Sequence, residues 1–144
     1  MKKIMIIGIG IFFTGITQGD ATLIINVNAH AEAAMLPVST PEMTPGIVSD
    51  RPLNLPGIGM LFLLGDDPTS VAWLTKNALQ LKRHRAEGLA VNIKDIDDLQ
   101  ALRQLAPSVR ISPASGSELS RRLQLFHYPV VLTDKALSQQ LSHE

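Results

Sequence analysis

The chain has 144 residues, with 13 basic and 13 acidic side chains and a formal net charge of zero. This balance gives no electrostatic reason to expect binding to nucleic acid or to anionic lipid. Cysteine is absent, which excludes disulfides, thiolate metal ligands and thiol catalysis. The length and the 45% hydrophobic content fit one globular domain with an ordinary core.

Residues 1–21 have the three parts of a secretory signal peptide. Lys2 and Lys3 give a positive start, and the apolar core over residues 4–16 is too short to cross a bilayer. A short stretch of small and polar residues then ends at Ala21, where we expect cleavage. The sequence therefore predicts export to the periplasm.

Two alternatives to cleavage at Ala21 stay open. Ala29-His30-Ala31 matches the small-x-small cleavage pattern better, but it lies far from the apolar core. The second alternative is an uncleaved leader that acts as an inner-membrane anchor, since residues 21–27 add apolar side chains after the polar break.

Residues 22–59 are expected to form an extended N-terminal segment. Residues 22–27 look strand-like, and residues 35–59, the Pro-rich segment, contain five prolines and three glycines that disfavour regular structure. Apolar side chains recur throughout the Pro-rich segment, which a solvated spacer does not need. This favours a segment that lies along the domain or a partner, with a plain tether as the alternative.

The chain is organised around a strand-to-helix switch. Residues 60–64 are all apolar, as in a strand buried on both faces. Asp67 is a suitable N-cap, and Pro68 fits the first helical position. We expect the helix to run over residues 67–87 and to stop at Gly88. Leu63, in the middle of the apolar run, should be a core residue.

The same alternation continues to the end of the chain. We expect strands over residues 89–93, 109–111 and 130–133, and helices over residues 95–106, 117–126 and 134–141. Helices of this length serve as crossovers between parallel strands. The sequence therefore predicts an α/β domain over residues 60–144, with a small, mostly parallel sheet in βαβαβαβα order.

Metal binding and catalysis find little support in the residue pattern. Asp66 and Asp67 follow a strand, and together with the carboxylates of residues 95–98 they would form a site for a hard cation. The pattern favours the other interpretation, in which these carboxylates cap helices. The four histidines lack the spacing of a zinc site. No nucleophile–base set is visible, so we expect no catalytic residues, no metal and no cofactor.

Two local motifs have ordinary structural interpretations beside functional or special ones. The basic run at residues 82–85 is more typical of a solvated helix end than of a nucleic-acid or lipid site. An aromatic residue before proline, as in Tyr128-Pro129, raises the tendency to a cis peptide bond, although trans bonds are commoner overall.

Several short motifs together resemble a known family. They are Met35-Leu36-Pro37-Val38, Thr44-Pro45-Gly46, Leu61-Phe62-Leu63-Leu64-Gly65-Asp66-Asp67, Gly88-Leu89-Ala90-Val91-Asn92, Ser112-Pro113-Ala114-Ser115-Gly116 and His127-Tyr128-Pro129-Val130. Across residues 35–133 the chain is similar to uncharacterised integrating conjugative element proteins, which genomic-island-type conjugation clusters encode. The resemblance implies an exported accessory or assembly protein of a conjugative type IV secretion system, with other proteins of that apparatus as partners.

A more distant resemblance concerns the end of the chain. The helix followed by Tyr128, Pro129 and a strand is similar to thioredoxin-like pilus-assembly proteins of F-type conjugation systems. This implies a thioredoxin-like fold in which Pro129 is a cis-proline that opens a strand. The loop at residues 66–70, where the redox Cys-x-x-Cys would fall, has no cysteine. A thioredoxin-like domain here would have no redox activity.

We therefore expect a protein that is not an enzyme and that works by protein–protein interaction. The expected partner-binding residues are Asp66, Asp67, His127, Tyr128 and Pro129, with His127 and Tyr128 forming an exposed tip held by Pro129. The alternatives are a small periplasmic enzyme or chaperone-like protein that uses the same thioredoxin-like cleft, and a membrane-anchored subunit if the leader is kept.

Overall fold

A computed structural model describes residues 31–141 of the chain. The chain divides into two compact units, Met1–Ala34 and Met35–Glu144. In the first unit, residues 31–34 are described and are helical. The expected signal peptide and the strand-like residues 22–27 lie outside the described residues. The second unit begins at Met35, so it includes the whole Pro-rich segment.

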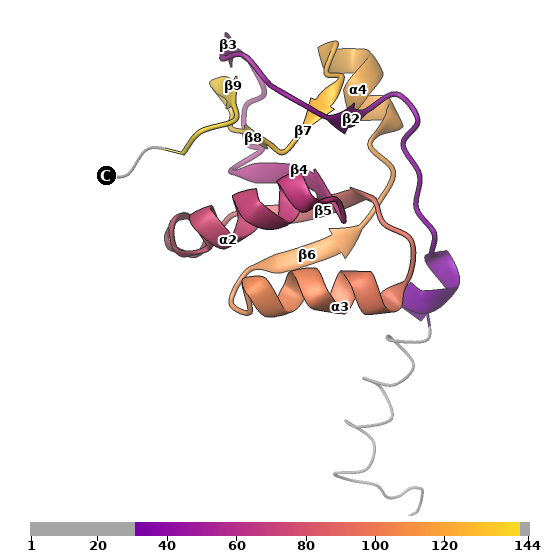
Figure 1. The fold of residues 1–144 in the computed structure, drawn as a ribbon. Helices are drawn as coiled ribbons and strands as arrows, with labels where there is room; N and C mark the ends of the chain where they lie inside the picture. Colours follow the sequence, from indigo (N-terminus) through magenta and orange to yellow (C-terminus); the bar gives the residue numbers. More distant parts are fainter. Residues whose placement is uncertain (1–30, 142–144) are drawn as a thin grey trace, which may run out of the picture. The chain divides into compact units, whose positions relative to one another are not determined.

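Strands and helices alternate in the middle of the second unit, and strands follow one another at both of its ends (Figure 1). In chain order its elements are β2 (Thr44–Pro45), β3 (Arg51–Pro52), β4 (Leu61–Gly65), α2 (Pro68–Arg83), β5 (Glu87–Asn92), α3 (Ile96–Leu105), β6 (Arg110–Pro113), α4 (Ser117–Leu123), β7 (His127–Tyr128), β8 (Val130–Leu132) and β9 (Ala136–Ser138).

In the described part of the chain, a six-stranded sheet has the order β3-β9-β8-β4-β5-β6. Its pairs β4–β5 and β5–β6 are parallel, whereas β4–β8, β8–β9 and β3–β9 are antiparallel. A separate parallel pair joins β2 to β7. The sheet is therefore mixed, and the prediction of a mostly parallel, thioredoxin-like βαβαβαβα domain is wrong.

The first cause of this difference is the shortness of α4. The connection between β6 and β8, residues 114–129, is long enough for a parallel crossover, but only its α4 part is helical. With seven residues, α4 spans only about 10 Å at the usual helical rise. It does not carry the chain back along the sheet, so β8 begins at the end where β6 finishes and runs antiparallel to β4.

The second cause is a tight turn where we expected a final helix over residues 134–141. Thr133 N donates to the carbonyl oxygen of Ala136 at 2.8 Å, and Thr133 Oγ1 accepts from Ala136 N at 3.0 Å. These bonds close a hairpin, so the chain continues as β9 against β8. Asp134 lies in the turn and caps no helix.

Each face of the sheet has its own core. Phe62 and Leu64 point to one face, where they pack with Leu74 of α2 and Leu99 of α3. Leu63 points to the other face, into a cluster that contains Met43, Tyr128 and Leu137 and against which α4 packs. Figure 1 shows α2 and α3 on one side of the sheet and α4 on the other. Leu63 is completely buried, which confirms it as a core residue.

The predicted N-caps of two helices are confirmed. Asp67 accepts from Ser70 N at 2.9 Å at the start of α2, and Asp95 accepts from Asp98 N at 2.9 Å at the start of α3. For α4 the N-cap position is Gly116, so Ser117 is the first helical residue and not the cap, and its backbone N–H donates to Ser115 Oγ at 3.2 Å.

The end of α2 differs from the expectation. The helix ends at Arg83, four residues earlier than predicted, and Gly88 lies inside β5. A Cβ at Gly88 would clash with the Cζ atom of Phe62. Glycine is required there because the Phe62 ring packs directly against the β5 backbone, and not because a helix stops.

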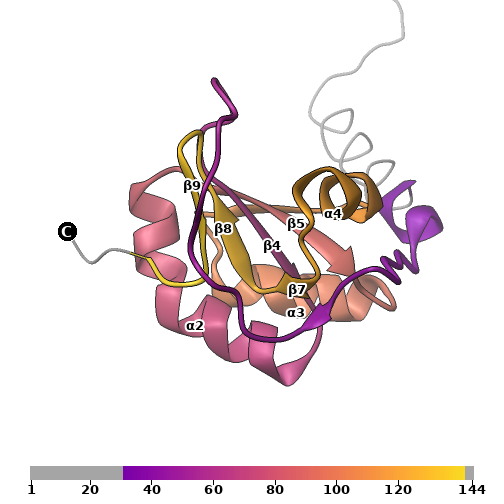
Figure 2. The same cartoon turned by 90° about the horizontal axis from the view of Figure 1, so that it is seen from above.

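The Pro-rich segment follows the domain and supplies two of its strands. Figure 2 shows it passing β7 and then β9. Thr44 N donates to Phe126 O and Gly46 N to Tyr128 O, both at 3.0 Å, while Leu53 N donates to Lys135 O at 2.8 Å. The segment is therefore part of the folded unit, as the reading of a segment that lies along the domain predicted.

Candidate functional site

Two short hydrogen bonds hold the Asp67 carboxylate at the switch from β4 to α2. Its Oδ2 accepts from Ser70 N at 2.9 Å, and its Oδ1 accepts from Ser70 Oγ at 2.8 Å. Ser70 Oγ in turn accepts from Gly65 N at 3.0 Å. Both carboxylate oxygens of Asp67 are thus occupied by the start of the helix, so this side chain has a structural role in the described structure.

Asp66 belongs to a small charged group with the first turn of α3. Its Oδ2 accepts from Lys94 N at 3.0 Å, and the Lys94 ammonium lies 3.7 Å from Asp66 and 2.8 Å from Asp98. The hydrogen bond from Lys94 lowers the pKa of the Asp98 carboxyl, and the same contact raises the pKa of Lys94. The lysine compensates these carboxylates, which leaves the group unlike a cation site.

Tyr128 is buried beneath this turn. A Cβ at Gly65 would lie 3.0 Å from both Cε1 and the hydroxyl oxygen of Tyr128, so glycine allows the ring to pack against the end of β4. The hydroxyl accepts from Asn92 Nδ2 at 3.1 Å. Burial raises the pKa of the Tyr128 phenol, the hydrogen bond from Asn92 lowers it, and the charges of Asp67 and Asp66 add to the increase.

Asn92 also holds the Pro-rich segment in place. Its Oδ1 accepts from Thr40 N at 2.6 Å, and its Nδ2 donates to Met43 O at 3.2 Å and to Thr40 O at 3.3 Å. Thr40 Oγ1 donates to Val91 O at 2.7 Å and accepts from Gly116 N at 2.8 Å. Thr40 and Met43 are almost fully buried, so these contacts form a fixed anchor.

His127 and Pro129 lie on either side of Tyr128 but in different surroundings. His127 is exposed, and its Nδ1 is 3.2 Å from Thr44 Oγ1. Pro129 is buried, and the Tyr128–Pro129 peptide bond is cis, as the distant resemblance implied. Leu36–Pro37 is a second cis peptide bond. Of the five expected partner-binding residues, the structure groups Asp66, Asp67 and Tyr128 around Gly65.

Tyr128 is buried, so His127 and Tyr128 do not form the exposed tip that we expected. Its side chain is only 3% exposed, so it does not offer surface to a partner as we expected. The exposed apolar side chains beside His127 are instead Phe126, at 52%, and Ile47, at 85%. Both line a hollow of about 140 Å³ together with His127 and Arg51.

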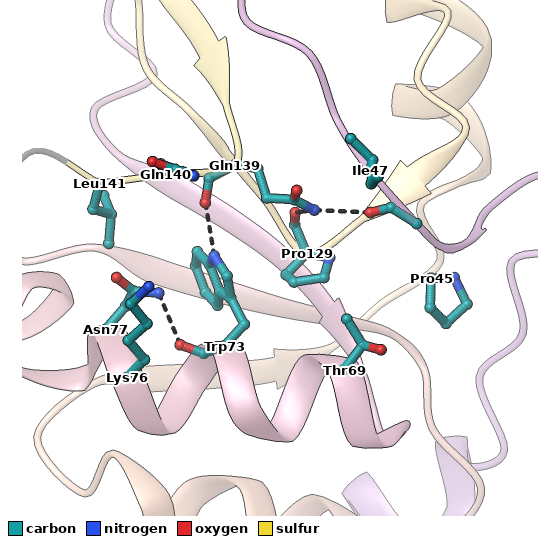
Figure 3. Close-up of a pocket in the computed structure, with 11 residues that line it drawn as sticks. Pro45, Ile47, Thr69, Trp73, Lys76, Asn77, Pro129, Gln139, Gln140 and Leu141 are labelled. Carbon is teal, nitrogen blue, oxygen red and sulfur yellow. Dashed lines mark hydrogen bonds between the residues drawn. The ribbon is translucent and has the colours of Figure 1, made fainter.

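A larger cavity of about 460 Å³ opens on the other side of Ile47 (Figure 3). Its walls come from residues 45–47 at the end of β2 and beyond, from α2 between Thr69 and Asn77, from Pro129, and from residues 139–141. Trp73 Nε1 donates to Gln139 O at 2.7 Å across this cavity, and Gln139 Nε2 donates to Gly46 O at 2.8 Å. Ile47 is therefore a ridge between two hollows.

The described residues contain no set of side chains arranged as metal ligands. Over residues 31–141, no group of three or more histidines and carboxylates could hold a metal ion. In the same part of the chain, no helix is long and apolar enough to cross a membrane. What the arrangement offers is an apolar ridge and two hollows beside it.

The sequence did not single out Ile47 and Phe126 as exposed apolar residues, nor Trp73, which is half-buried and lines the larger cavity. Phe126 falls in the helix expected over residues 117–126, but α4 ends at Leu123 and the Phe126 side chain is exposed. The one available signal was the run of apolar residues in the Pro-rich segment. It indicated contact with something, but it could not show which of them would remain exposed.

Comparison with known proteins identifies the family. The chain matches the model of the family described as "Protein of unknown function (DUF2859)" over residues 17–137. The chain belongs to this family. No curated protein matches it significantly, and neither does any solved structure. The DUF2859 match includes the Pro-rich segment as well as the sheet, which agrees with their packing into one unit.

Proposed function

We propose that this DUF2859 protein is an exported accessory or assembly protein of the conjugative type IV secretion system of an integrating conjugative element, and that it acts by binding another protein of that apparatus. The motif resemblance over residues 35–133 supports the setting. The signal-like leader over residues 1–21 supports export to the periplasm.

The observation that carries the binding role is the exposure of Ile47 and Phe126 around one hollow. Single exposed apolar side chains are ordinary, but two large ones that share a hollow make a patch suited to a partner. Apolar anchors that fill pockets supply much of the binding energy in protein interfaces. We name Ile47, Phe126 and the hollow between them the Ile47–Phe126 surface.

The rim of the Ile47–Phe126 surface is polar and partly fixed. Arg51 Nη2 donates to Leu123 O at 2.6 Å and to Gln124 O at 3.3 Å, which holds its side chain beside the hollow. His127 lies next to it and is exposed. An apolar centre with a polar rim is the usual anatomy of a protein–protein interface.

The proposal is tested by DNA transfer from donor cells that carry an Ile47→Ser, Phe126→Ser double variant. Loss of both apolar anchors should reduce the transfer frequency about tenfold or more. The matched control is Leu79→Ser, because Leu79 is also a large exposed apolar residue, at 58%, but lies on α2 and lines neither hollow.

The double variant must be exported at the normal level, measured by immunoblot of periplasmic extracts. Both replaced side chains are exposed, so neither substitution should unfold the domain. Normal transfer with the double variant, or an equal loss with Leu79→Ser, would contradict the proposed function.

A further inference from the structure

The cavity beside Ile47 has walls that are hydrogen-bonded to one another. Gln139 connects three of them, because its backbone carbonyl accepts from Trp73 Nε1 at 2.7 Å and its side-chain amide donates to Gly46 O at 2.8 Å and to Pro129 O at 3.0 Å. Figure 3 shows Trp73 rising from α2 toward Gln139. The cavity is therefore built into the fold, and a ligand does not have to form it.

The lining has an apolar body and a single charge. The rings of Pro45, Trp73 and Pro129 and the side chain of Ile47 supply apolar surface. Lys76 is the one charged residue of this lining, and no ion pair with it is found within residues 31–141. An apolar wall next to an uncompensated ammonium is complementary to an apolar group that carries a nearby carboxylate.

The size and position of the cavity favour a peptide. About 460 Å³ is enough for one large side chain with its backbone, and Ile47 joins this cavity to the Ile47–Phe126 surface. A chain that crosses Ile47 can place one side chain in each hollow.

We infer that this cavity receives a large apolar side chain from a peptide segment of the partner protein, and that Lys76 pairs with an Asp or Glu beside that side chain. This inference rests on the proposed function, since it states the chemistry of the segment that the Ile47–Phe126 surface recognises. In this assignment Lys76 selects peptides with an acidic residue, and the walls around Trp73 contact the apolar side chain.

Selection from a random heptapeptide phage library on the full-length protein tests the inference. The wild type should enrich peptides in which a large apolar residue lies within two positions of Asp or Glu. The Lys76→Glu variant should enrich peptides with Lys or Arg in that place, because the charge at the rim is reversed. Lys135→Glu makes the same charge change in the β8–β9 turn, away from the cavity, and should select as the wild type does.

A synthetic peptide from the wild-type selection gives the quantitative test. Replacing its acidic residue by the matching amide should weaken binding to the wild type about twofold to fivefold, the range of an exposed ion pair. The same replacement should have no effect on the Lys76→Gln variant, which closes a double-mutant cycle. Trp73 is the chain's one tryptophan, so its emission should shift to the blue as the peptide shields the indole from water.

Absence of enrichment, an acidic preference that persists in Lys76→Glu, or binding without a change in Trp73 emission would each overturn the inference. The transfer experiment separates it from the proposed function. Selected peptides that behave as expected, together with normal transfer by the Ile47→Ser, Phe126→Ser variant, would refute the function and leave the cavity assignment standing. Impaired transfer without peptide enrichment would refute the cavity assignment alone.

Discussion

Tyr128 shows how one residue can have a structural role where a surface role was expected. Its ring fills the space over Gly65, and its hydroxyl accepts from Asn92, which also holds Thr40 and Met43. The phenol therefore lies at the junction of β4, β5 and the Pro-rich segment. Substitutions at Tyr128 should act through stability and not through the loss of a contact with a partner.

We predict that Tyr128→Phe lowers the free energy of unfolding by about 0.5–1.5 kcal/mol, the usual net contribution of a hydrogen bond. The cost should stay in this range because Asn92 Nδ2 keeps backbone carbonyl acceptors at Thr40 and Met43. Urea unfolding of both proteins at neutral pH measures the difference.

The pH dependence of this difference has a definite sign. The pKa of Tyr128 in the folded protein is raised above its ordinary value of 10.0, chiefly by burial. Below pH 10 the phenol is protonated in both states, and its contribution to stability is complete. Above pH 10 the unfolded chain loses the proton more readily, so the contribution declines as the pH rises toward the folded-state pKa.

The stability of the wild type should therefore fall more steeply above pH 10 than that of Tyr128→Phe. Tyr128 is the single tyrosine of the chain, so phenolate absorbance reports this group alone. Parallel stability profiles, or a phenol that titrates at its ordinary value in the folded protein, would contradict its buried placement.

At the scale of elements, Gly88 distinguishes a strand from a helix stop. In the structure it lies in β5, with Phe62 where its side chain would be. Gly88→Ala should cost about 1–3 kcal/mol through overpacking, measured by urea unfolding. Adding Phe62→Leu should recover part of this loss, because the shorter side chain leaves room for the new methyl group.

The two substitutions should thus be strongly non-additive. A Gly88→Ala cost that Phe62→Leu does not reduce would point to a backbone effect at a helix end, as the sequence reading assumed. Phe62→Leu alone provides the control, since it is expected to destabilise by leaving part of the ring volume empty.

Local features of the elements could be predicted from the sequence, whereas their pairing could not. Asp67 and Asp95 cap their helices through bonds to residues only three positions away, so the local pattern contains the whole interaction. The direction of β8 depends on the length of α4 and on the turn at Thr133. The assumption that every helix connects two parallel strands takes account of neither the length of α4 nor the turn at Thr133.

The candidate surface depended even more on distant contacts. Thr40 and Asn92 are 52 residues apart in sequence, and their bonds position the segment that exposes Ile47. The apolar side chains spaced through the Pro-rich segment favoured contact with the domain or a partner, but they did not indicate that Met43 would be buried and Ile47 exposed. Exposure is a property of the assembled fold, and no local pattern specifies it.

At the scale of the whole molecule, the Pro-rich segment and the sheet act as one unit that presents Ile47 between two hollows. One hollow contains Phe126 and the other Trp73 and Lys76. Because the anchor at Thr40 and the strand pairs β2–β7 and β3–β9 hold the segment in place, the ridge is preorganised. Preorganisation lowers the ordering cost of binding.

Site-specific photocrosslinking in mating cells tests the docking role most directly. A photoreactive amino acid is placed at position 126 or at position 47, with position 79 on α2 as the control that has similar exposure but lines neither hollow. If Ile47 and Phe126 contact the proposed partner, positions 126 and 47 give the same covalent adduct with a protein encoded by the conjugative element, and position 79 does not. No adduct from positions 126 and 47, or the same adduct from position 79, would contradict the docking role.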